Sequence, residues 1–223
     1  MFWLAVTLMV LLGYLAGSVS FAILIARWVM GVDIREVGNK NPGAANVLRS
    51  VGIPWGILVG ALDGLKALVP MWLVQHHVLT TWELADILTV FAVGAASLVG
   101  HCKPIFHGFD GGKGAGPFLG ILIYFVFWES LLTFVISTTV VVLFVRGVAH
   151  RWSRWGPIVA ISIGPFLLGV LEVLGPFTAG PVTLGDKGWP VVLGVFSSSM
   201  VILGLNYTFM SERVVELKDE QAL

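Results

Sequence analysis

Two polar, glycine-rich segments carry most of the residues in this sequence that could do chemistry. The first segment reads Gly38-Asn-Lys-Asn-Pro-Gly-Ala-Ala-Asn-Val-Leu-Arg49, and the second reads Gly100-His-Cys-Lys-Pro-Ile-Phe-His-Gly-Phe-Asp-Gly-Gly-Lys-Gly114. Each combines glycines, whose backbone amides can approach a ligand closely, with Lys, Arg, Asn or His side chains that donate hydrogen bonds to phosphate oxygens. The two segments therefore predict a site for anionic, phosphate-bearing molecules.

The second segment ends in a Gly-Gly-Lys-Gly stretch just before an apolar run that starts at Phe118. A nucleotide-hydrolysing P-loop is not predicted, because only three residues separate Gly108 from the Gly-Lys pair and no Ser or Thr follows. Consecutive glycines and a lysine at a helix start still suit a phosphate group. The alternative is a flexible turn whose lysine anchors at the lipid headgroups. The candidate residues of this stretch are Gly111, Gly112, Lys113 and Gly114.

The first segment alternates polar residues with small ones. Its amides and its guanidinium supply hydrogen-bond donors, while its small residues allow tight packing. The candidate phosphate-binding residues here are Asn41, Gly43, Asn46 and Arg49. The alternative is a helix start capped by asparagine, followed by an arginine that extends to the membrane surface.

Ionisable residues also occur inside or beside the apolar runs, where they are costly and usually paired. Asp63 and Lys66 lie three residues apart on one face of a predicted helix. Either their pairing is purely structural, or Lys66 faces the anionic site. His101 stands at the start of the second segment and is a candidate phosphate donor or proton acceptor. No metal site is predicted, because His101, Cys102 and His107 lack a second ligand pair with zinc spacing.

The elements that must position these residues are membrane helices. Of the 223 residues, 57% are hydrophobic and only 12% are charged, and the mean hydropathy is +0.92, well above that of soluble domains. A formal net charge of zero gives no general attraction for nucleic acid, and a single cysteine excludes an intrachain disulfide. We therefore expect one polytopic, all-α integral membrane domain over residues 1–223.

A helix needs about 20 mainly apolar residues to cross a bilayer. The apolar runs predict spans at Phe2 to Met30, Ile53 to Gln75, Ala85 to Val99, Pro157 to Gly175 and Pro190 to Met210. The run from Phe118 to Val145 is ambiguous, because about 42 Å of helix at 1.5 Å per residue is long for one span and short for two. A Trp-Glu-Ser interruption at residues 128–130 would suit a turn at the membrane interface.

Basic residues indicate how the chain crosses, because cytoplasmic loops are enriched in Lys and Arg. They occur in both glycine-rich segments and between Arg146 and Arg154, whereas the connections from His76 to Leu84 and from Pro176 to Trp189 are poor in them. If the basic loops are all cytoplasmic, the ambiguous run must cross twice. This predicts seven transmembrane helices, with the N-terminus outside and the C-terminus cytoplasmic. One long tilted helix, giving six in total, is the alternative.

Together with Gly17-Ser-Val-Ser-Phe21 and Leu62-Asp-Gly-Leu-Lys66, the two segments resemble the PlsY family of bacterial membrane glycerol-3-phosphate acyltransferases, which use acyl phosphate. The resemblance covers about half of the chain. In the first segment this chain keeps Gly38, Asn41, Gly43, Ala44, Asn46, Val47 and Arg49 of the family pattern, and in the second it keeps Gly100, His101, Pro104, Phe106, Gly111, Gly112, Lys113 and Gly114.

The resemblance implies a multi-pass protein of the bacterial cytoplasmic (inner) membrane with its site on the cytoplasmic side. It implies transfer of a fatty acyl group from acyl phosphate to the 1-hydroxyl of glycerol 3-phosphate, giving lysophosphatidic acid and phosphate, without a cofactor. Membrane lipids and a soluble enzyme that makes acyl phosphate would be the partners. The catalytic residues would be His101, Lys113 and Arg49, with phosphate bound by Asn41, Gly43, Asn46, Gly111, Gly112 and Gly114.

Several positions depart from the family pattern. Asn39, Lys40 and Ala45 replace Ser, Gly and Thr, Lys103 replaces an aromatic residue, and Asp110 replaces Lys. The family's tail carries a catalytic His and Asn, but the stretch after Asn206 contains no histidine. Either His150 or His101 substitutes, or the substrate supplies its own base, or the chain is a paralogue with altered or no turnover that binds phosphorylated lipid precursors. The supporting candidates are Asp63, Lys66, His150 and Ser153, the last being nearest to a serine of the family's cytoplasmic loop.

Overall fold

The computed structural model describes residues 2–79, 83–127 and 188–206, with a few isolated positions between 132 and 170. Within these ranges every element is helical, as the composition predicts. The elements are α1 (Phe2–Ser18), α2 (Phe21–Met30), η1 (Ile34–Glu36), α3 (Ala44–Ser50), α4 (Ile53–His77), α5 (Leu84–Cys102), η2 (Ile105–His107), α6 (Ala115–Phe125) and α9 (Gly188–Leu205).

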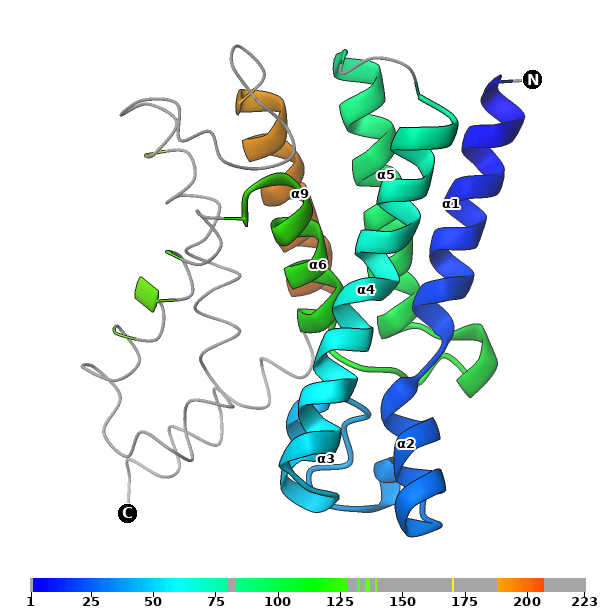
Figure 1. Cartoon of the computed structure of the whole chain (residues 1–223), viewed down its shortest axis with the longest axis vertical. Helices are drawn as coiled ribbons and strands as arrows, with labels where there is room; N and C mark the ends of the chain where they lie inside the picture. Colours follow the sequence, from blue (N-terminus) through cyan, green and yellow to red (C-terminus); the bar gives the residue numbers. More distant parts are fainter. Residues whose placement is uncertain are drawn as a thin grey trace.

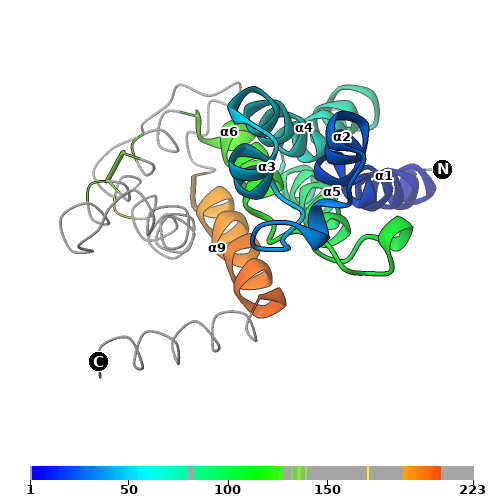
Figure 2. The same ribbon diagram turned by 90° about the horizontal axis from the view of Figure 1, so that it is seen from below.

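The long helices α1, α4 and α5 lie side by side, and α6 and α9 pack beside them (Figure 1). Among the described residues, three segments are long and apolar enough to cross a membrane, namely Phe2–Met30, Ile53–His77 and Leu84–His107. The short elements α2 and α3 gather at the end of the bundle opposite the N-terminus, and the view from that end places them over α4 and α5 (Figure 2). The first segment leads through α3 into the start of α4, and the second segment begins at the end of α5, which runs antiparallel to α4 (Figure 1), so both segments lie toward the same end of the bundle.

Glycines allow the helices to touch backbone to backbone. A Cβ on Gly17 of α1 would collide with the Ser97 carbonyl of α5, and a Cβ on Gly120 of α6 would collide with the Gly64 carbonyl of α4. Small residues at helix contacts are typical of membrane bundles, where close packing drives association. The apolar core then fills the space between α4, α5, α6 and α9, with Met71, Phe91, Leu98, Ile121, Phe125 and Val195 among its buried side chains.

A proline inside α4 fixes one polar contact between helices. Pro70 has no backbone N–H, so it cannot bond to the carbonyl of Lys66 four residues earlier. The buried Ser97 hydroxyl of α5 donates to that carbonyl instead, at 2.8 Å. The hydrogen bond satisfies a group that would otherwise be orphaned in an apolar interior, and it sets α5 against the middle of α4.

The predicted first span is divided, contrary to the single helix expected from its hydropathy. The helix is interrupted at Val19 and Ser20. Ser20 adopts an extended conformation and caps α2, because its hydroxyl accepts a hydrogen bond from the Ile23 amide. On the other side of the break, the Ser18 hydroxyl donates to the Tyr14 carbonyl. Serine side chains that bond to local backbone favour helix ends over helix interiors, which explains the break.

Other predicted spans agree with the structure to different extents. The helices α4 and α5 match the predicted runs Ile53 to Gln75 and Ala85 to Val99 within a few residues, and α9 covers most of Pro190 to Met210. The ambiguous run begins earlier than predicted, since α6 starts at Ala115, and α6 ends at Phe125. The predicted interruption at 128–130 and the arginine loop lie outside the described residues, as does the span Pro157 to Gly175 apart from position 170.

Candidate active site

Asn46 holds the first glycine-rich segment in shape. Its side chain is fully buried. The amide nitrogen donates to the carbonyls of Ile34 at 3.1 Å and Val37 at 2.9 Å, while the amide oxygen accepts from the Asn39 backbone at 3.2 Å and from Ser50. With both ends of its amide engaged by the loop, Asn46 stabilises the backbone around the site.

The remaining candidates of this segment lie nearer the surface. Asn41 and Gly43 are half-buried, and Gly43 is the N-cap of α3. Arg49 lies in the last turn of α3 with an exposed side chain. Because Asn46 and Arg49 are three residues apart on one short helix, the contacts of Asn46 also set the position from which Arg49 extends.

The second segment folds back over the end of α5. The Gly112 amide donates to the His101 carbonyl at 3.0 Å, and a Cβ on Gly112 would collide with Nε2 of the His101 ring. Gly114 is the N-cap of α6 with a φ of 85°, a left-handed conformation that favours glycine. Lys113 is half-buried between them, and its carbonyl accepts from the Asn206 side chain at 3.1 Å. The backbone of Gly112 thus lies directly on the imidazole.

Lys66 lies at the centre of a buried polar cluster. Its ammonium lies 2.9 Å from Asp63 Oδ1, 3.1 Å from His101 Nδ1 and 3.2 Å from the Gly17 carbonyl. Asp63 and Lys66 are only 3% and 5% exposed, so the ion pair is desolvated, and the ammonium has two further partners in the Gly17 carbonyl and His101 Nδ1. The structure places Lys66 against His101, beside the second segment.

The cluster also determines which nitrogen of His101 carries the proton. An ammonium has three donors and no acceptor, so His101 Nδ1 must accept from Lys66. In the neutral ring the proton then resides on Nε2, which is the nitrogen that lies against Gly112. His101 therefore presents an N–H donor, and not a proton acceptor, toward the glycine-rich segment.

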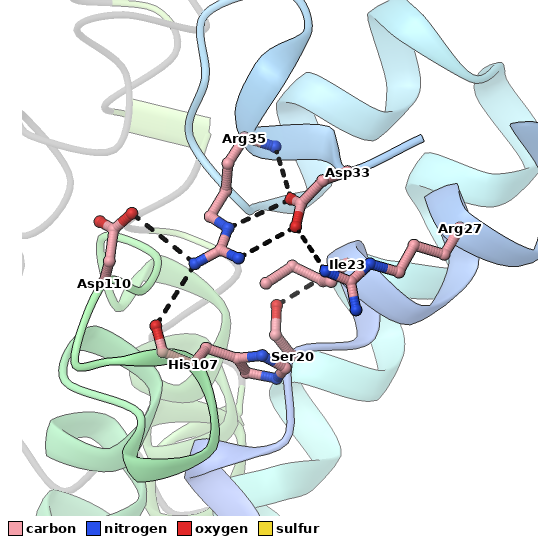
Figure 3. Close-up of polar contacts among 7 residues, drawn as sticks. All are labelled: Ser20, Ile23, Arg27, Asp33, Arg35, His107 and Asp110. Atoms are coloured by element: carbon pink, nitrogen blue, oxygen red, sulfur yellow. Dashed lines mark hydrogen bonds and ion pairs between the residues drawn. The ribbon is translucent and has the colours of Figure 1, made fainter. Parts of the chain in front are cut away.

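A second polar cluster joins the residues just before the first segment to the second segment (Figure 3). Asp33 accepts from the side chains of Arg27 and Arg35, and Arg35 also reaches the carbonyl of His107. Hydrogen bonds from Arg35 and Arg27 lower the pKa of Asp33 well below its ordinary value, although burial opposes the shift, and the same Asp33 contact raises the pKa of Arg35. Both groups stay ionised at neutral pH.

The structure thus brings several predicted residues together and leaves others apart. His101, Gly112, Asp63 and Lys66 form one buried group, with Gly111, Lys113 and Gly114 continuing from it. The first segment with Asn41, Gly43, Asn46 and Arg49 forms a separate unit with η1. His150 and Ser153 lie outside the described residues.

Sequence reasoning missed the residues that connect these units. No role is predicted for Arg35, although it follows Asp33 at an Asp-x-Arg spacing. Tyr14 donates to the Lys103 carbonyl at 2.9 Å, and Asn206 reaches Lys113 from α9. These contacts join residues 89 or more positions apart, so nothing in the local pattern could have indicated them.

The family model described as glycerol-3-phosphate acyltransferase matches residues 7–208 of this chain. Similar proteins of that name include one from Anaeromyxobacter sp. (strain K), 46% identical over 124 residues that make up 56% of this chain and 61% of that protein. Another, from Anaeromyxobacter sp. (strain Fw109-5), is 40% identical over 167 residues, or 75% of this chain and 74% of that protein.

Two solved structures are similar over nearly the whole chain. They are crystal structures of PlsY (YgiH), an integral membrane glycerol 3-phosphate acyltransferase, in a glycerol 3-phosphate form and a lysophosphatidic acid form. The first aligns with a TM-score of 0.71 and 25% identity, covering 95% of this chain and 93% of the PlsY chain. This chain therefore belongs to the glycerol-3-phosphate acyltransferase family of integral membrane acyltransferases.

Proposed function

We propose that this chain transfers a fatty acyl group from acyl phosphate to the 1-hydroxyl of glycerol 3-phosphate, giving lysophosphatidic acid and inorganic phosphate. The observation that carries the proposal is the location of two glycine-rich segments, each containing a cationic residue, toward the same end of a membrane bundle. The glycerol 3-phosphate and lysophosphatidic acid forms of the similar PlsY structure support the same substrate and product for this chain.

The reaction depends more on stabilising negative charge than on a strong nucleophile. The substrate hydroxyl attacks the acyl carbonyl, the new ester C–O bond forms, and the bond from the acyl carbon to the phosphate oxygen breaks. Phosphate leaves with the electron pair and takes up the hydroxyl proton. Because both substrates are anions, the protein must hold them together against repulsion and offset charge on the departing phosphate. Lys113 and Arg49 supply that positive charge.

His101 acts in this scheme as a hydrogen-bond donor. Its Nε2–H faces the Gly112 backbone, where it can stabilise a phosphate oxygen or the developing oxyanion. Since Lys66 occupies Nδ1, the substrate phosphate is the more suitable proton acceptor. Gly111, Gly112 and Gly114 allow the backbone to approach a phosphate group closely. Asn41 and Gly43 contribute to phosphate binding from the first segment. Asn46 positions Arg49 through its contacts with the loop.

The decisive test is turnover by the purified protein with acyl phosphate and labelled glycerol 3-phosphate. We expect lysophosphatidic acid to form, and Lys113→Ala and Arg49→Ala each to reduce kcat/KM by about a hundredfold or more, because a charge that stabilises the transition state is lost. Lys103→Ala is the matched control: it removes an exposed cation from the same segment, and activity should stay near that of the parent.

The other results of that assay are equally informative. Product formed only from an acyl thioester would contradict acyl phosphate as the donor. Absence of product with any acyl donor would contradict the acyltransferase proposal, and measurable binding of glycerol 3-phosphate in that case would favour a paralogue that has kept the phosphate site without turnover. A soluble enzyme that makes acyl phosphate is the partner this chemistry requires.

We also propose seven membrane helices in the bacterial inner membrane, with both glycine-rich segments on the cytoplasmic side. Their location at one end of the bundle supports a shared side, and their basic residues support the cytoplasm. Single cysteines at Asn39, Asp110 and Ser153 in a Cys102→Ala background should all be labelled from the cytoplasm by a membrane-impermeant reagent. Labelling of the Ser153 position from the opposite face would favour six helices.

A further inference from the structure

Asp33 and Arg35, which lie between α2 and α3, form an ion pair that contains three hydrogen bonds. Arg35 donates from Nε to Asp33 Oδ1 at 3.1 Å and from Nη2 to Asp33 Oδ2 at 2.9 Å. The backbone amide of Arg35 donates to the same carboxylate at 3.0 Å, since Asp33 caps η1. A guanidinium bound through two parallel hydrogen bonds has a fixed orientation. The third nitrogen of the group, Nη1, is therefore aimed in one direction.

That direction leads to the second glycine-rich segment (Figure 3). Arg35 Nη1 donates to the His107 carbonyl at 3.3 Å and lies 3.9 Å from Asp110 Oδ2. The Asp110 side chain is 75% exposed, so solvent screens this longer contact and it contributes little. The hydrogen bond to the carbonyl dominates, because it is charge-assisted and its donor is already oriented.

Both ends of this contact are tied to site residues. On one side, the carbonyls of Ile34 and Val37 flank Arg35 and hold the Asn46 amide, whose helix carries Arg49. On the other side, His107 is the last residue of η2 and precedes Gly112 by five residues. The Gly112 amide in turn donates to the His101 carbonyl. A movement of Arg35 relative to His107 would therefore change the distance between the cations of the two segments.

We propose that Asp33 and Arg35 are positioning residues that hold the two glycine-rich segments at the separation needed for two phosphorylated substrates. We call Asp33, Arg35 and the His107 carbonyl the loop clasp. The inference rests on the proposed function, since the separation matters only if each segment binds one anion. Neither residue touches the substrates in this scheme, and their effect passes through Arg49 and the second segment.

A distance measurement tests the clasp without any enzymatic assay. Spin labels on cysteines at Lys40 and Ile105, two exposed positions on the two segments, would report their separation in a Cys102→Ala background. We expect Arg35→Lys and Arg35→Ala to broaden or shift the distance distribution, because lysine keeps the charge but cannot form the fork. Arg27→Ala is the matched control. It removes another guanidinium from Asp33 without touching the second segment.

Kinetics on the same variants then test the positioning role. Arg35→Lys should raise KM for glycerol 3-phosphate or acyl phosphate about tenfold or more, since small misplacements of binding groups are costly, while its melting temperature stays near that of the parent. Arg27→Ala should change KM much less.

Several results would overturn the proposal. An unchanged distance distribution in Arg35→Ala would show that the clasp does not set the separation. A changed distribution with unchanged KM would reduce the clasp to a structural contact. If the parent protein shows no turnover, the proposed function fails, whereas the distance measurement still decides whether the clasp exists.

Discussion

Lys66→Met is expected to abolish activity and to reduce sharply the yield of folded protein. The substitution leaves the Asp63 carboxylate, 3% exposed, buried without its cationic partner. Breaking a buried ion pair on one side costs about 3–5 kcal/mol, a large part of the stability of a typical domain. The expected observation is a sharp fall in monodisperse protein after detergent extraction, measured by size-exclusion chromatography with a thermal melt.

A double variant separates the structural role of Lys66 from its role toward His101. Asp63→Asn combined with Lys66→Met removes both charges, so folded protein should recover because no unpaired charge remains. His101 Nδ1 would still lack the donor that fixes the ring and its tautomer. By analogy with the orienting partners of metal-bound histidines, we expect a loss of activity of about ten- to a hundredfold. A double variant that folds and keeps full activity would mean that the cluster only stabilises the bundle.

Gly112→Ala is expected to reduce kcat/KM by about a hundredfold, the scale of losing one donor that stabilises a developing anion, with little loss of folded protein. The new methyl group would occupy the position of His101 Nε2, so the ring or the segment must move. The predicted loss therefore passes through His101. Gly204→Ala in α9 is the control, because a Cβ at that position meets no atom within 4 Å and activity should be unchanged.

A double-mutant cycle checks the route of this effect. In a His101→Ala background the space beside Gly112 is open, so adding Gly112→Ala should cost little further activity. Neighbouring residues that act through one contact give non-additive changes of this kind. If the two substitutions are fully additive, Gly112 acts independently of His101, for example by direct backbone contact with phosphate.

The elements and contacts that could be predicted from the sequence are those set by local spacing. The bounds of α4 and α5 follow from continuous apolar runs, and the Asp63 to Lys66 pair follows from helical spacing. The break at Val19 and Ser20 was not predicted, because hydropathy averages over the serines whose side chains end and start the helices. A cap preference read at Ser20 would have indicated it.

The contacts across the site could not be predicted, for a physical reason. Lys66 and His101 are 35 residues apart, and Arg35 and His107 are 72 apart. Their meeting depends on how α5 packs against α4 and how the segments fold over the helix ends, which no local pattern encodes. Asn46 shows a second limit, because a side-chain amide can donate equally well to a phosphate or to backbone carbonyls. In the structure its nitrogen donates to the carbonyls of Ile34 and Val37.

The break between α1 and α2 has a consequence for how this protein responds to genetic change. In a continuous helix the Gly17 carbonyl would accept the amide four residues later, but here α1 ends at Ser18 and the carbonyl accepts from Lys66 at 3.2 Å. Every amino acid carries the same carbonyl, so no substitution at position 17 deletes this acceptor. A mutational scan would register Gly17 only through its collision with Ser97. Side-chain substitution therefore cannot remove the Gly17 carbonyl as a partner of Lys66, and only chemical modification of the backbone can do so.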